Sequence, residues 1–227
     1  MKRIGFIGAY DKTDLIIYVA KALTTLGKKV LVVDNTTMQK ARYIVPTINP
    51  SKAYITEFEG IDVSVGFENY DEIKKYLGIQ ANKDLEYDIA IIDVDSIEIF
   101  EKFDIKTCEK NYFVTSFDLY SLKKGLEILN KVLEPIKLTK VLFSKDILKE
   151  DDEYLNLLSL GRKVIWNENY RVYFPIDNGD ESVIIENQRV AKIGIRKLSS
   201  QYKESLYYIV EDILSNEVNS RRNKKSI

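Results

Sequence analysis

Histidine is absent from the 227-residue sequence, and Cys108 is its single cysteine. One thiol cannot form a disulfide within the chain. Without histidine there is no Cys/His zinc site, no Ser-His-Asp or Cys-His nucleophilic system, and no imidazole base. Any catalysis by this chain must therefore use carboxylates, lysines, hydroxyls or a bound metal ion.

Long uncharged runs and a strong net charge are also missing. No apolar stretch approaches the roughly 18 residues of a membrane span. Asp11 and Lys12 interrupt the N-terminal apolar run too early for a signal peptide. The formal net charge is −1, so any basic surface that attracts nucleic acid must be local. We expect a cytoplasmic protein.

Apolar runs alternate with helical patterns along the chain, with no Gly/Ser/Pro-rich linker between them. The strand candidates are 2–7, 29–34, 53–58, 61–67, 87–93, 111–116, 141–144 and 170–174. Helical patterns cover 15–23, 70–77, 96–103, 119–133, 150–160, 181–188 and 199–216. This predicts one α/β domain over residues 1–217, a doubly wound and mostly parallel sheet with helices on both faces. A short, basic, flexible tail would follow at 218–227.

The turn after the first strand candidate is a variant of a phosphate-binding loop. It reads Gly8-Ala9-Tyr10-Asp11-Lys12-Thr13, whereas the full motif is G-x-x-x-x-G-K-[ST]. In a working loop, Lys12 neutralises phosphate oxygens and the Thr13 hydroxyl ligates Mg²⁺. The alternative is that these residues only begin a helix, with Thr13 or Asp11 as its N-cap. Asp11 replaces a glycine, and its carboxylate would repel a triphosphate unless a cation intervened.

Six landmarks follow one another in a recognisable order. They are Gly8–Asp14, Val33-Asp34, Ile91-Ile92-Asp93, Asp118–Leu122, Phe143-Ser144 and Pro175-Ile176-Asp177. This order resembles the ParA/MinD-type branch of the P-loop NTPases, ATPases that position plasmids, division sites, flagella, pili and secretion machines. The resemblance spans roughly residues 2–214, and it implies the P-loop NTPase fold.

The resemblance also implies roles for individual residues. Asp34 and Asp93 stand where the family organises catalytic water and Mg²⁺, and Thr13 with Asp93 would hold that metal. The residues that would contact ATP are Gly8, Lys12, Thr13, Ser144, Pro175 and Asp177. For the two aspartates the alternative is that they cap the following turn, with Asp95 capping the helix at Ser96. Pro175 to Asp177 is also an ordinary turn sequence.

The sequence departs from the family at most other loop positions. Its signature lysine falls on Ile7, its second and third glycines on Ala9 and Asp11, its second hydroxyl on Asp14, and its base-recognising asparagine on Ser144. ATP and Mg²⁺ are therefore the cofactors that the resemblance implies. The changes in the loop favour an alternative in which the site binds neither of them.

The favoured hypothesis is a divergent positioning or assembly factor of partition, pilus, conjugation or secretion machinery, with weak or no ATPase activity. An active ATPase that uses DNA or membrane is the alternative, and a small-molecule ligase or kinase on the same fold is weaker. The resemblance implies a homodimer and a protein partner in such machinery. The tail, with Arg221, Arg222, Lys224 and Lys225, either contacts DNA or anionic membrane or is simply solvated. Contact of the tail with DNA or membrane would place the protein at the periphery of the nucleoid or the membrane.

Overall fold

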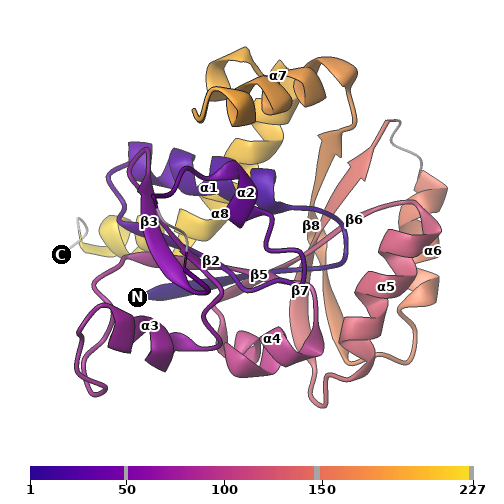
Figure 1. The fold of residues 1–227 in the computed structure, drawn as a ribbon. Coiled ribbons are helices and arrows are strands. Elements are labelled where there is room, and N and C mark those ends of the chain that lie inside the picture. The colour runs from indigo at the N-terminus through magenta and orange to yellow at the C-terminus, as the bar shows by residue number, and fades with distance from the viewer. Residues whose placement is uncertain (49–50, 146–148, 225–227) are drawn as a thin grey trace.

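The computed structural model describes residues 1–48, 51–145 and 149–224, and Figure 1 shows its arrangement. The strands are β1 (Lys2–Ile7), β2 (Val30–Asp34), β3 (Tyr54–Phe58), β4 (Ile61–Val65), β5 (Ile89–Val94), β6 (Lys110–Ser116), β7 (Ile136–Ser144) and β8 (Val164–Pro175). The α-helices are α1 (Thr13–Thr25), α2 (Ala41–Ile44), α3 (Tyr70–Tyr76), α4 (Ile97–Lys102), α5 (Leu119–Asn130), α6 (Lys149–Leu158), α7 (Asn178–Arg189) and α8 (Ser200–Lys224). Two 3₁₀ turns cover Ile105–Thr107 and Ile195–Lys197.

The strands form one sheet in the order β3-β4-β2-β5-β1-β6-β7-β8. Every neighbouring pair is parallel except the β3–β4 hairpin. The register places Asp34 opposite Asp93 and Asp93 opposite Phe6, so β1, β2 and β5 end at the same edge. Ligands of doubly wound sheets bind at this carboxyl edge.

Helices cover both faces of the sheet (Figure 1). On one face, α1 and α8 bury apolar stripes against alternate strand residues such as Ile4 and Phe6. On the other face, α3, α4, α5 and α6 pack against the intervening residues, including Ile7 and Leu31. This two-sided burial explains why the central strands are almost unbroken apolar runs. The predicted doubly wound α/β fold is confirmed.

Several boundaries differ from the predicted ones. β7 and β8 pair from Ile136 and Val164 onward, well before the expected starts. Helix α5 ends at Asn130, so Leu133 is 88% exposed, whereas Leu126 is buried. The backbone of α8 stays helical to Lys224, beyond the expected end at Asn216, and the tail residues 225–227 lie outside the described part.

None of the helices within the described ranges combines the length and the apolar character needed to span a bilayer.

Candidate functional site

The loop between β1 and α1 is tied to the two strands that flank β1. The Gly8 amide donates to the Val94 carbonyl of β5 over 2.9 Å. Gly8 has a φ of +148°, and a Cβ there would lie 2.1 Å from the Val114 carbonyl oxygen of β6. Only glycine fits this close approach without backbone movement, so the structure explains this residue of the loop.

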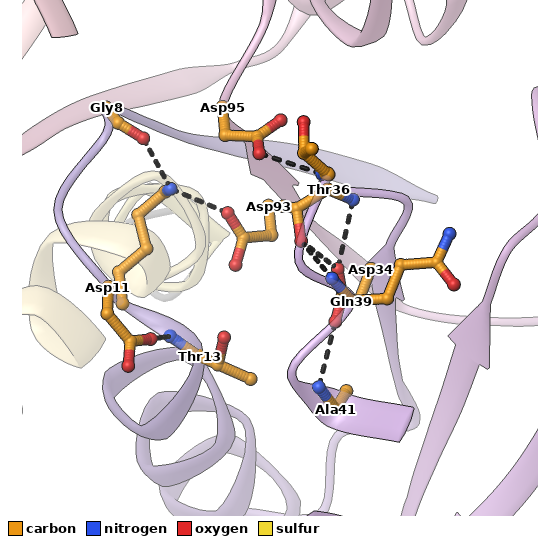
Figure 2. A network of polar contacts seen from close by, with 11 residues as sticks. Gly8, Asp11, Thr13, Asp34, Thr36, Gln39, Ala41, Asp93 and Asp95 are labelled. Carbon is orange, nitrogen blue, oxygen red and sulfur yellow. Dashed lines mark hydrogen bonds and ion pairs between the residues drawn. The ribbon is translucent and has the colours of Figure 1, made fainter. Parts of the chain in front are cut away.

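Lys12 ends the loop and points back into it. Its side chain is 3% exposed, and its ammonium donates to the Gly8 carbonyl over 2.8 Å and lies 2.7 Å from Asp93 Oδ1. Figure 2 shows Gly8 and Asp93 at the two ends of these contacts. The ammonium that would meet a phosphate is therefore neutralised within the protein.

Asp93 is buried at the end of β5, and its pKa is raised to about 7. Desolvation is the largest cause, because burial disfavours the charged carboxylate. Lys12 lowers the pKa, while Asp34 and Asp95 raise it. The charge of Asp93 therefore changes near neutral pH.

Asp11 lies beside a cation that no sequence pattern singled out. Lys40 Nζ lies 2.5 Å from Asp11 Oδ2 and 2.6 Å from Asp14 Oδ2, and we call this contact the Lys40 bridge. The other Asp11 oxygen accepts a 3.2 Å hydrogen bond from the Thr13 amide. The N-cap position itself is occupied by Lys12, so the expectation that Thr13 or Asp11 is the N-cap is wrong.

Asp34 holds the segment that follows β2. Its carboxylate accepts hydrogen bonds from the Thr36 amide (3.0 Å), the Thr36 hydroxyl (2.6 Å) and the Ala41 amide (3.0 Å), as Figure 2 shows. These contacts match the capping alternative, and a catalytic role for Asp34 stays a prediction. Asp95 accepts from the Thr37 amide over 2.8 Å. The Ser96 side chain caps α4 itself, so the expected cap from Asp95 is wrong.

A cavity of about 340 Å³ lies beside the loop, and its lining includes Pro175 and Asp177, two of the residues that the resemblance assigns to ATP contact. Tyr10 and Phe143 line it with their ring centroids 4.8 Å apart, and Pro175 and Asp177 complete the wall. Asp177 caps α7, accepting from the Gly179 amide over 2.7 Å. Acidic side chains outnumber basic ones in the lining, five to one: Asp11, Asp14, Asp177, Asp180 and Glu181 against Lys40.

The structure brings most of the predicted residues to one edge of the sheet. Ser144 pairs with Pro175 across β7 and β8, and its carbonyl accepts from the Ile176 amide over 2.9 Å. Thr13 is buried at the start of α1. Sequence reasoning missed Lys40 and Tyr10: no motif marks Lys40, and Tyr10 occupies a variable position of the loop.

These residues fit a nucleotide and its metal in part. Gly8 permits the close backbone approach of the loop, whereas the Lys12 ammonium is turned toward Gly8 and Asp93. Tyr10 and Asp11 of the loop line the cavity. A Mg²⁺ ion on Asp93 would compete with Lys12 for the same carboxylate. Within the described part of the chain, no three acidic or cysteine side chains are grouped to hold a metal ion.

Comparison of the sequence with protein-family models and with curated proteins found no match. Solved structures do match. A plasmid partition protein from Borrelia burgdorferi bound to AMPPNP is 15% identical, with a TM-score of 0.62 over 95% of this chain and 99% of that chain. The ParA family ATPase from Chlorobium tepidum is 18% identical, with a TM-score of 0.58 over 94% and 98%.

A chain of a MinC:MinD cell division protein complex from Aquifex aeolicus is 11% identical, with a TM-score of 0.56 over 91% of this chain and 93% of that chain. The chain has the ParA/MinD fold. At these identities the likeness concerns the arrangement of helices and strands, and the chemistry of the loop must be argued from its own residues.

Proposed function

We propose that this protein is a ParA/MinD-like positioning or assembly factor whose nucleotide site binds ATP weakly and hydrolyses it slowly or not at all. The fold supports the first part. The likeness to proteins named for plasmid partition and cell division places positioning roles first among the functions to test.

The local charge carries the second part of the proposal. Asp11 and Asp14 lie in and directly after the loop, where they pair with Lys40, and Asp93 pairs with Lys12. Asp34 and Asp95 act electrostatically on Asp93, so five carboxylates stand against two lysines. Two like charges 4 Å apart repel by about 1 kcal/mol in water and by several times that near a protein surface. A triphosphate therefore meets a net negative field here, although the loop backbone has kept its close approach to β6.

A bound nucleotide would use a small set of the chain's residues. Lys12 would turn from Asp93 toward the phosphates, Gly8 would let the backbone approach them, and Tyr10 with Pro175 would border the base. Bound Mg²⁺ would supply charge neutralisation at the phosphates. The partition protein bound to AMPPNP and a complex of Cyanothece McdA with ATP support ATP as the nucleotide to test.

We further infer a homodimer that meets across the loop and a protein partner in positioning or secretion machinery. In the family the signature lysine reaches the second subunit, but here that position is Ile7, which has no exposed surface. A dimer of this chain would thus rest on side-chain packing. MinD in its complex with MinC supports the expectation of a protein partner.

Calorimetric titration with ATP and Mg²⁺ tests the proposal. We expect a Kd of about 0.1–1 mM, that is, roughly 4–5.5 kcal/mol of binding free energy, and little phosphate release. Asp11→Asn should tighten binding roughly tenfold, since removing one nearby charge is worth about 1.4 kcal/mol. Asp84→Asn, an exposed change in the loop before β5, is the matched control. Micromolar binding with brisk turnover that Lys12→Ala abolishes would refute the proposal.

An active, nucleotide-driven ATPase is the second candidate, favoured by the retained Gly8 and Lys12. It predicts dimers that form with ATP and dissociate without it. It also predicts binding to DNA or to anionic liposomes that is lost when residues 220–227 are removed. Sedimentation velocity tests this candidate by comparing the oligomeric state with and without nucleotide. The same oligomeric state in both conditions would exclude it.

A further inference from the structure

A large hollow lies away from the loop, between α1, α7 and α8. Its volume is about 1470 Å³, and we call it the α1–α8 groove. Its lining residues are contributed by the C-terminal parts of α1 and α7, residues 190–197 and the middle of α8. Lys21, the first residue of α1 in its lining, lies eight positions after Thr13, about 12 Å along the helix at 1.5 Å per residue. The groove and the cavity beside the loop have no lining residue in common, so the two hollows are distinct.

The floor and walls of the groove are mostly apolar. Ala22, Ile193 and Val210 are buried at its base, while Val190 and Tyr207 are 53% and 51% exposed at its sides. Small-molecule pockets usually measure about 300–1,000 Å³, so this volume suits a segment of polypeptide better. Exposed apolar patches of this kind mark interaction sites.

Positive charge surrounds the apolar lining. Five basic side chains border the groove against two acidic ones: Lys21, Lys192, Arg196, Lys197 and Lys203 against Glu186 and Glu211. Lys21 pairs with Glu59, and Lys197 pairs with Glu186. Lys192 and Arg196 are exposed, and neither side chain forms an ion pair with a described residue. The rim of the groove therefore carries positive charge, on Lys192 and Arg196, that no ion pair with a described residue balances.

We propose that the α1–α8 groove binds one amphipathic helix of a protein partner, apolar along one stripe and acidic on its flanks. Such a helix would place its stripe on Val210 and Tyr207 and its carboxylates beside Lys192 and Arg196. The chain's own C-terminal segment is a poor occupant because its Arg221, Arg222, Lys224 and Lys225 would add to the positive rim. This docking does not depend on nucleotide binding.

The test uses three synthetic, fluorescein-labelled peptides of about 15 residues, long enough for a marginal helix. One has a leucine stripe with glutamate flanks, the second has lysine flanks, and the third is a scramble of the first. Fluorescence anisotropy with the full chain should show the acidic peptide binding at least about tenfold more tightly than the other two at low salt. The preference should shrink at about 0.15 M salt.

Variants locate the binding. Lys192→Glu with Arg196→Glu should weaken the acidic peptide roughly tenfold and improve the lysine peptide. Both residues are exposed, so circular dichroism should show an unchanged fold. Lys102→Glu, at the end of α4 on the opposite face, is the matched control and should leave binding unchanged.

Three results with the peptides would each overturn the proposal. They are no binding by the acidic peptide, equal binding by all three peptides, or the same loss with Lys102→Glu as with the groove variant. A second copy of this chain is the competing occupant. Sedimentation that shows self-association, removed by Val190→Asp, would assign the groove to that contact instead.

Discussion

The buried ion pair between Lys12 and Asp93 makes the strongest prediction about stability. Lys12→Met removes the ammonium and keeps much of the apolar stem, leaving Asp93 buried without its counter-charge. The two side chains are 3% and 4% exposed, so water cannot replace the lost contact. Removing one partner of such a pair typically costs about 3–5 kcal/mol. That is a large part of the roughly 5–15 kcal/mol that keeps an ordinary domain folded.

The cost of Lys12→Met should depend on pH. Without Lys12, the cause that lowers the Asp93 pKa is gone, so this pKa rises above about 7. At pH 6 the Asp93 side chain of the variant is protonated and neutral. At pH 8 it must either stay charged in an apolar site or bind a proton, and both lower the free energy of unfolding. We therefore expect a larger loss of unfolding free energy at pH 8 than at pH 6.

A double-mutant cycle measures the pair directly. Asp93→Asn alone leaves Lys12 buried and unpaired, but the double variant Lys12→Met/Asp93→Asn leaves neither charge. Its loss should be smaller than the sum of the single losses by at least about 2 kcal/mol. Urea unfolding followed by circular dichroism at both pH values gives the four free energies.

Lys102→Met is the control for the cycle, because its pair with Glu68 is largely exposed. Its effect should stay below about 1 kcal/mol. Additive single losses at pH 8, or a Lys12→Met variant as stable as the control, would refute the view that the loop lysine and Asp93 form one coupled unit.

Three further predictions concern the same edge of the sheet. Gly8→Ala should lower the unfolding free energy by more than about 3 kcal/mol, because its methyl group would meet the Val114 carbonyl, whereas Gly78→Ala, with nothing within 4 Å, should cost about 1 kcal/mol. Equal melting temperatures for the two variants would contradict this. Asp34→Ala should speed proteolysis of the segment after β2 more than it speeds cleavage elsewhere, because three hydrogen bonds are lost; uniform cleavage rates would argue against it. The folded carboxyl of Asp93 has a pKa of about 7 against 3.8 unfolded, so its contribution to stability is present below pH 4 and lost as pH rises to about 7. Asp93→Asn should remove this slope from a pH series of urea melts, and an unchanged slope would count against the assignment.

The sequence predicted the fold because its signals are local. Apolar runs of strand length alternate with helical patterns, and such alternation favours a doubly wound parallel sheet. Strand-ending residues such as Asp34 and Asp93 could likewise be placed at the carboxyl edge, since parallel strands end together. Leu133 shows the limit: it falls in the predicted helix 119–133, but α5 ends at Asn130 and the Leu133 side chain is exposed.

What the sequence determined by itself is the order of elements and the position of an altered loop at the ligand edge. What tertiary structure decided is how the charges there are used. Lys40 lies 26 positions from Asp14 along the chain, and only folding brings its ammonium to that carboxylate. The pairing of Lys12 with Asp93 and the α1–α8 groove have the same origin. Charge and hydrogen bonding act through space, and distant segments become neighbours only when the sheet has assembled.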